Sequence, residues 1–266
     1  MLIIYNALDF RLRNFFAFSR GRPDLKAESK AGLFKEKSAQ DRAEAEERQA
    51  ELVEKYRLEG LVHHSSRELY LKNLYYLDLL DEVFSRGGVS LPDPVSAADI
   101  GPSHWFYVRA LWSGLTWWDK TKPRQVKLTG YEPDAYRIYP DFYSRIDHAR
   151  AHLDGLAGVS FQPSGFPRLP EKFDLISQFF PFLFLPDHLK WGLPRKRFAP
   201  RKLMEDLWLS IKPSGFCLII NQGEEEFREQ GRLLRALGLE PGHVFHFRSQ
   251  FYTYQHPSWV TLLMKR

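Results

Sequence analysis

The sequence predicts an α/β fold, a mostly parallel sheet flanked by helices, with an N-terminal helical extension. From residue 95 onward, short apolar runs alternate with helical stretches, which is typical of parallel βα units. Before residue 92, composition and apolar spacing favour helices. Pro92 and Pro94 separate the two regions. We therefore expect a helical extension over residues 1–92 and an α/β domain over residues 93–266.

The extension opens with an apolar segment over residues 1–18. Asp9, Arg11 and Arg13 interrupt it, and it is shorter than the roughly 20 apolar residues that span a bilayer. It lacks the basic start and small-residue cleavage site of a signal peptide. We expect an N-terminal element packed on the domain, with interfacial membrane contact as the alternative.

Two further helical stretches complete the extension. Residues 20–60 are rich in Ala, Glu, Lys, Gln and Arg, a helix-forming composition. Their apolar stripe is thin, so this helix is expected to lie on the domain or on a partner subunit. Residues 65–84 carry leucines at three- and four-residue steps, which predicts an amphipathic helix that ends near Gly87 and Gly88.

The α/β domain contains four clear strand candidates and several weaker ones. The clear candidates are residues 95–100, 125–131, 173–179 and 216–221. Weaker runs lie at residues 158–162, 244–247 and 259–264. The helices expected between these strands cover residues 105–112, 140–153, 200–211 and 224–237, the second of them opening at a proline.

Acidic residues follow two consecutive strands of the predicted sheet. The first strand ends at Asp99, before a tight turn at Gly101 and Ser103, and the second ends in Tyr131 and Glu132. Ligands of open α/β sheets bind at the carboxyl ends of the strands, and a carboxylate there can accept hydrogen bonds from ribose hydroxyls. The sequence therefore predicts a nucleoside site at this edge.

These motifs resemble those of the class I S-adenosylmethionine-dependent methyltransferases, which have a Rossmann-like fold. Asp99, Gly101 and Ser103 resemble the family's glycine-rich first motif, and Glu132 resembles its ribose-binding acid. Residues 173–176 resemble the fourth motif, and residues 212–215 resemble the lysine-proline-glycine-glycine turn. The resemblance implies that S-adenosylmethionine is the cofactor and that the chain transfers its methyl group to an acceptor.

The resemblance also implies roles for residues farther along the domain. Cofactor contacts are expected from Tyr131, Gln178 and, near the adenine, Ser164; acceptor contacts are expected from Phe179, Asn221 and Gln222; and His188 is a candidate general base. Phe179 has the alternative of a core aromatic side chain, and His188 that of a surface histidine.

Two departures from the family's pattern oppose this interpretation. His104, Trp105 and Phe106 follow Ser103 where the family places further glycines, and the acid of the third motif is missing. They leave open a non-catalytic methyltransferase-like module that binds partners. The histidines at 63, 64, 148 and 152 do not form a convincing metal set.

The amino-acid composition excludes few classes of binding partner. The single cysteine, Cys217, excludes a disulfide framework and fits a cytoplasmic protein. The net charge of +5 is modest, and its densest part is residues 190–202, which are expected to be a solvated face. We expect a small-molecule acceptor, with nucleic-acid methylation as an alternative that no binding motif supports.

Overall fold

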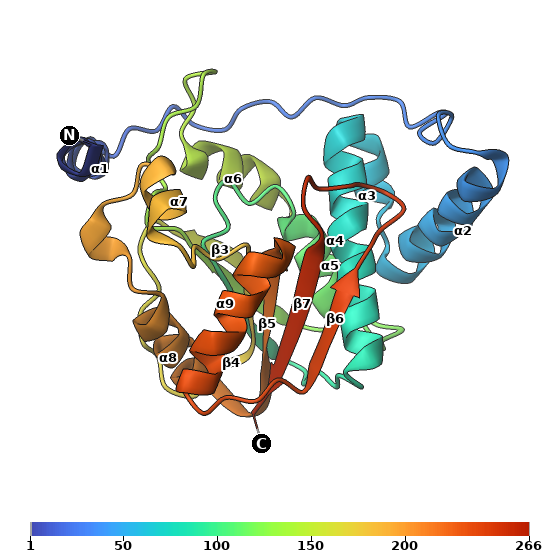
Figure 1. The fold of residues 1–266 in the computed structure, drawn as a ribbon. Coiled ribbons are helices and arrows are strands. Elements are labelled where there is room, and N and C mark those ends of the chain that lie inside the picture. Colours follow the sequence, from blue (N-terminus) through green and yellow to red (C-terminus); the bar gives the residue numbers. More distant parts are fainter. Residues whose placement is uncertain (1, 266) are drawn as a thin grey trace.

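A computed structural model describes residues 2–265 and shows a seven-stranded sheet with helices on both faces (Figure 1). The strand order is β3-β2-β1-β4-β5-β7-β6. Only β7 runs antiparallel to its neighbours β5 and β6. The strands are β1 (Val95–Ile100), β2 (Val126–Tyr131), β3 (Val159–Gln162), β4 (Phe173–Phe179), β5 (Ile211–Gln222), β6 (His243–Phe247) and β7 (Ser258–Met264). The predicted α/β class and mostly parallel sheet are confirmed.

Each face of the sheet buries a separate apolar cluster. Ala97 and Leu128 belong to the larger cluster, with side chains from α2 (Ala39–Tyr56), α4 (Arg67–Arg86), α5 (Val108–Trp117) and α6 (Arg145–Leu153). Ala98 and Ile219 belong to the smaller cluster, with side chains from α8 (Pro200–Ser210) and α9 (Gly223–Ala236). This division follows from the strand period of two, which points successive side chains to opposite faces.

The larger cluster crosses the expected domain boundary at residue 92. Leu74, Leu77 and Leu80 of α4 are fully buried in it together with Val95 of β1. The division into a helical extension over residues 1–92 and an α/β domain over residues 93–266 stays a prediction. Among residues 2–265, no helix has the length and apolar character needed to cross a membrane.

The N-terminal segment differs most from the expectation. The helical stretch predicted over residues 20–60 begins only at Ala39, where the Ser38 side chain caps α2 by accepting a hydrogen bond from the Asp41 amide at 3.1 Å. Residues 17–38, which we call the strap, run from α1 (Leu2–Phe16) past α6 and α3 (Glu59–His63) to α2 (Figure 1). Pro23 within the strap disfavours a continuous helix through this segment.

Contacts with α6 hold the strap in place. The backbone amides of Arg20 and Gly21 donate to the Asp147 carboxylate at 3.1 and 3.2 Å, and the Ser19 hydroxyl donates to it as well. Gly21 has φ of 109°, a conformation that glycine adopts at little cost. Tertiary hydrogen bonds of this kind override the helix propensity of the surrounding sequence.

Several predicted element boundaries were also wrong. The helix expected at 105 begins at Val108, because Ser103 and Trp105 adopt φ of 58° and 51° and hold the chain outside the helical region. The helix expected at Pro140 begins at Arg145, after a capping box formed by Ser144 and Asp147. The strand expected at 216 begins at Ile211, which pairs with Phe173.

The segment around the candidate base His188, residues 186–192, is helical in its first part. It forms α7 (Leu185–Lys190), followed by a short 3-10 helix, η1 (Arg195–Arg197). Pro186 lies in the first turn of α7, where proline is favoured because its missing N–H has no helical partner to lose.

The contact between Gly130 and Trp105 yields a test of the packing. A Cβ atom on Gly130 would lie 2.7 Å from the Trp105 ring, which is fully buried. We predict that Gly130→Ala lowers the free energy of unfolding by about 1–3 kcal/mol through overpacking. The control, Gly231→Ala on α9, meets no atom closer than 3.4 Å and should leave stability equal or slightly higher. Urea denaturation measures both, and equal stabilities would contradict the packing described.

Candidate functional site

The acids predicted at the strand tips lie on one edge of the sheet. β1 and β2 are adjacent and parallel, with Ile100 paired to Tyr131, so Asp99 and Glu132 emerge at the same end of neighbouring strands. Ser164 follows β3 on the next strand tip, where Tyr131 pairs with Gln162. The structure thus gathers these predicted residues along one edge, although their side chains have different surroundings.

The Glu132 carboxylate is buried and joins two loops. It is 4% exposed, and one oxygen accepts the Ser103 amide at 2.8 Å while the other accepts the Asp134 amide at 2.8 Å. The Arg145 guanidinium lies 3.6 Å from the carboxylate. Burial raises the pKa of Glu132, and the nearby Arg145 charge opposes that rise. Glu132 therefore fastens the β1–α5 loop to the β2–α6 loop.

The Asp99 carboxylate is directed into the protein interior. It is fully buried, accepts the Tyr107 hydroxyl at 2.8 Å and accepts the Ser177 hydroxyl at 2.7 Å. Burial raises the pKa of Asp99 to about 6, against these two hydrogen bonds. Through these two hydrogen bonds Asp99 connects Tyr107, the residue before α5, to Ser177 of β4. Its side chain therefore supports the strand edge from the protein interior.

A third buried carboxylate, not recognised in the sequence, lies two residues after Glu132. Asp134 is fully buried and pairs with Arg13 of α1 at 2.6 Å, with Arg137 at 2.6 Å and with Arg145 at 3.2 Å. In the sequence, an acid at 134 with an arginine three residues later is a weak signal for such an ion pair. Because Arg13 also donates to the Gly192 carbonyl at 3.0 Å, this network ties α1 to the edge of the sheet.

The remaining predicted cofactor residues occupy varied environments. Ser164 is exposed, and its amide donates to the Gln162 carbonyl at 2.8 Å. The Tyr131 ring packs edge-on against Phe166 at 5.2 Å, and Gln178 is buried in β4 at 6% exposure. Their cofactor contacts stay predictions.

The predicted acceptor residues lie on β4 and at the end of β5. The Phe179 ring stacks on Tyr76 at 5.3 Å within the core, as the alternative of a core aromatic proposed. Asn221 is fully buried, and neither amide atom of its side chain has a hydrogen-bond partner among the described residues. The Gln222 backbone amide donates to the Glu226 carboxylate at 2.8 Å, at the start of α9.

His188 belongs to α7 and is not a surface histidine. It is 5% exposed, and its Nε2 lies 3.0 Å from the Pro194 carbonyl, to which it must donate because a carbonyl only accepts. Burial lowers the pKa of His188, and this hydrogen bond opposes the shift. Only Nδ1 is left to accept a proton, so any catalytic role depends on that atom.

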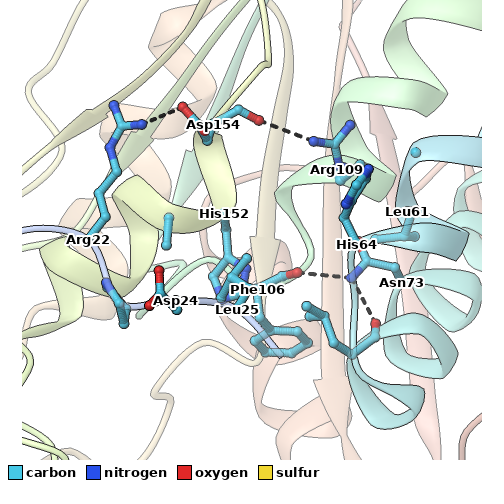
Figure 2. A pocket seen from close by; sticks show the side chains of 14 residues that line it. Arg22, Asp24, Leu25, Leu61, His64, Asn73, Phe106, Arg109, His152 and Asp154 are labelled. Atoms are coloured by element: carbon cyan, nitrogen blue, oxygen red, sulfur yellow. Dashed lines mark hydrogen bonds and ion pairs between the residues drawn. The ribbon is translucent and has the colours of Figure 1, made fainter. Parts of the chain in front are cut away.

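A cavity of about 460 Å³ lies beneath the strap (Figure 2). Its walls come from the strap, α3, α4, the β1–α5 loop, α5 and the end of α6, and neither Asp99 nor Glu132 lines it. Its lining includes Arg22, Asn73, Phe106, Arg109, His152 and Asp154. Phe106 belongs to the same loop as Ser103, so one loop joins the cavity to the strand-tip acids.

Polar contacts close the cavity from the strap side. Figure 2 shows Arg22 paired with the Asp154 carboxylate and Arg109 donating to the Asp154 carbonyl, the latter at 3.2 Å. Asn73 donates to the Phe106 carbonyl at 3.0 Å. The Arg22 pair is exposed and adds little stability, as surface ion pairs generally do.

Three histidine rings pack together: His104 belongs to the Ser103 loop, and His148 and His152 belong to α6, where His152 lines the cavity. The His104 ring lies 6.1 Å from His148 and 6.1 Å from His152, and the His104 Nδ1 is 3.1 Å from the Tyr139 hydroxyl. Burial lowers the pKa of His104 to about 4 and that of His152 to about 3, with neighbouring cations adding to the effect. Both rings are therefore neutral near pH 7.

Comparison with known proteins identifies the fold. No protein-family model matches the chain, and no curated protein matches it. A candidate class I S-adenosylmethionine-dependent methyltransferase from Listeria monocytogenes is similar with a TM-score of 0.50 and 13% identity, over 73% of this chain and 59% of that chain. An S-adenosylmethionine-dependent methyltransferase from Aquifex aeolicus gives a TM-score of 0.49 and 19% identity, over 73% of this chain and 96% of that one.

A third similar structure, an S-adenosylmethionine-dependent methyltransferase from Leishmania major, gives a TM-score of 0.49 and 14% identity, over 80% of this chain and 82% of that one. At these identities the similarity concerns the fold. The chain has the class I methyltransferase fold, and the predicted structural resemblance is confirmed.

The half-buried histidines His104 and His152 predict a pH dependence of stability. Because His104 and His152 have folded pKa values of about 4 and about 3, the unfolded chain binds protons first. Stability is therefore full above about pH 6.5 and falls as the pH drops toward 4. Asp99, with a raised pKa of about 6, acts in the opposite direction between about pH 6 and pH 4.

Replacing one histidine isolates its contribution. We predict that His152→Leu flattens the loss of unfolding free energy between pH 7 and pH 5, measured by urea denaturation at each pH. His243→Leu, at an exposed position of β6, serves as the control and should keep the wild-type slope. A wild-type slope in His152→Leu would contradict the assignment.

Proposed function

We propose that this chain binds S-adenosylmethionine at the carboxyl edge of β1 and β2 and transfers its methyl group to a small molecule. One observation carries the proposal: the Glu132 carboxylate stands at the tip of β2, hydrogen-bonded to Ser103 of the loop that follows β1. When bound, the cofactor supplies a methyl group on an electrophilic sulfonium. The fold and the order of its motifs support this class of chemistry.

The Glu132 carboxylate has the hydrogen-bonding capacity that a ribose requires. A carboxylate offers about four acceptor positions, and two are used by the amides of Ser103 and Asp134. The remaining capacity matches two ribose hydroxyls. The chemistry therefore fits, whereas the low exposure of Glu132 requires the β1–α5 loop to move before a nucleoside can reach it.

The β1–α5 loop has a conformation suited to such movement. Ser103 and Trp105 are non-glycine residues in the left-handed region, which costs roughly 1–2 kcal/mol each. A displaced loop can relieve part of this cost, which offsets some of the energy lost when the Ser103 amide leaves Glu132. Gly101, with φ of 69°, provides a hinge at the start of the loop.

The other residues of the edge orient and support the ligand. Asp99 fixes Tyr107 and Ser177, and so holds the floor of the site. Ser164, exposed beyond β3, is available to the adenine, and Gln178 lies on β4, the strand that pairs with β1. Methyl transfer depends mainly on alignment and desolvation, so the chain needs no strong general base.

The cavity beneath the strap supports a small-molecule acceptor. Its volume of about 460 Å³ lies in the range of small-molecule sites, roughly 300–1,000 Å³. Phe106 connects its wall to the Ser103 loop, and the Arg109 guanidinium provides a cation beside it. A polymer would have to displace the strap, whereas a small molecule only needs the Arg22 side to open.

The non-catalytic module remains the second candidate. The observation that favours it is the engagement of both Glu132 oxygens with the chain's own amides at 4% exposure. In that case the loop would keep its place permanently, and the edge would serve as a rigid support for α1. Binding of the cofactor distinguishes the two candidates.

Calorimetry with S-adenosylhomocysteine tests the proposal. We predict that the wild-type chain binds it and that Glu132→Gln weakens binding at least about tenfold, or about 1.4 kcal/mol, through loss of the charged acceptor. Glu225→Gln, exposed on α9, is the control and should bind like wild type. Absence of binding by wild type would favour the non-catalytic module, and equal affinity of Glu132→Gln would place the ligand elsewhere. Circular dichroism confirms that each variant is folded.

A further inference from the structure

Helix α1 has one face that docks on the protein. Asn6 donates to the Leu189 carbonyl at 2.8 Å, Phe10 is 5% exposed, and Arg13 pairs with the buried Asp134. These residues recur at three- and four-residue steps, so they share one face of the helix. The helix is thus held firmly at the periphery of the molecule, beside α7 (Figure 1).

The opposite face of α1 is apolar and exposed. Its stripe consists of residues spaced by three and four positions, which places them together along the helix: Ile4, Leu8, Leu12 and Phe15, with Phe16 beside them. Phe15 is 81% exposed and Ile4 is 75% exposed. Isolated exposed apolar side chains are common, but a continuous stripe of them marks an interaction surface.

Unpaired cations lie directly beside this stripe. A hollow between α1 and η1 is lined by Arg11 and Phe15 from α1 and by Lys196 and Arg197 from η1. The Arg197 guanidinium lies over the Phe10 ring at 4.7 Å. Within residues 2–265, neither Arg11 nor any of the cations at 195–197 has a carboxylate partner. The helix therefore borders a positive patch that the chain itself does not neutralise.

We propose that the exposed face of α1 and the cations at 11 and 195–197 form a docking surface for an anionic lipid membrane. A helix that lies in the membrane interface buries an apolar face at the boundary of the acyl chains, while adjacent lysines and arginines contact anionic headgroups. Both parts are present here, side by side. This inference is independent of the cofactor proposal.

Other occupants match only half of the surface. A nucleic acid would satisfy the cations but leave the stripe of Ile4, Leu8 and Phe15 in water. A second copy paired about a two-fold axis would cover the stripe but bring like charges from two η1 segments into proximity. An anionic bilayer satisfies the apolar stripe and the cations together.

Vesicle sedimentation tests the docking surface. We expect the full chain to sediment with phosphatidylcholine vesicles that contain phosphatidylglycerol, and to release as salt is raised, but to bind pure phosphatidylcholine weakly. The double variant Leu8→Asp/Phe15→Asp should lose at least about tenfold of this partitioning, and Arg195→Glu/Lys196→Glu should lose the preference for the anionic lipid. Val244→Asp, an exposed apolar position on β6, is the control and should bind like wild type.

Light scattering without lipid measures whether wild type and the Leu8→Asp/Phe15→Asp variant are monomers or dimers. Leu8 and Phe15 are exposed, so their replacement should leave the thermal unfolding temperature unchanged. The proposal is overturned if wild type ignores the anionic vesicles, or if it binds them and the Leu8→Asp/Phe15→Asp variant binds equally. It is also overturned if wild type is a dimer that this variant converts to monomers without any loss of lipid binding. The same holds if the basic patch binds RNA and does not bind anionic lipid.

Discussion

The candidate site depends on one buried carboxylate at the tip of β2. A charge out of water requires hydrogen bonds or an opposite charge, and Glu132 obtains both from Ser103, Asp134 and Arg145. These contacts set the paths of the two loops that leave β1 and β2. Because Asp134 then holds Arg13, the position of α1 follows from the same arrangement. The edge of the sheet, the loops that leave β1 and β2, and helix α1 are therefore connected through these contacts.

The two proposals, cofactor binding and membrane docking, depend on different properties of this connected structure. In the proposed function, the Ser103 loop leaves Glu132 when the cofactor binds, and that loop also carries Phe106 of the cavity wall. The proposal therefore implies that a ligand at one place alters the other, as expected when two sites share one loop. Membrane docking instead requires α1 to stay fixed, which the ion pair between Arg13 and Asp134 provides.

The sequence predicts the sheet well because strand signals are local. The apolar run at residues 95–100 forms β1 with those bounds, and parallel pairing brings Asp99 and Glu132 to one edge. The strap was predicted to be helical because it contains many helix-forming residues. Its composition does not reveal the hydrogen bonds to Asp147 that hold it in another conformation. The role of Asp134 was missed because its partner Arg13 is 121 positions away. Long-range pairing and loop burial, unlike strand period, leave no short pattern in the sequence.

The most direct test of the cofactor site is an experimental structure with S-adenosylhomocysteine bound. The account predicts ribose hydroxyls within hydrogen-bonding distance of the Glu132 carboxylate and a Ser103 amide withdrawn from its present 2.8 Å contact. A nucleoside bound elsewhere, with the contact between Ser103 and Glu132 intact, would contradict it.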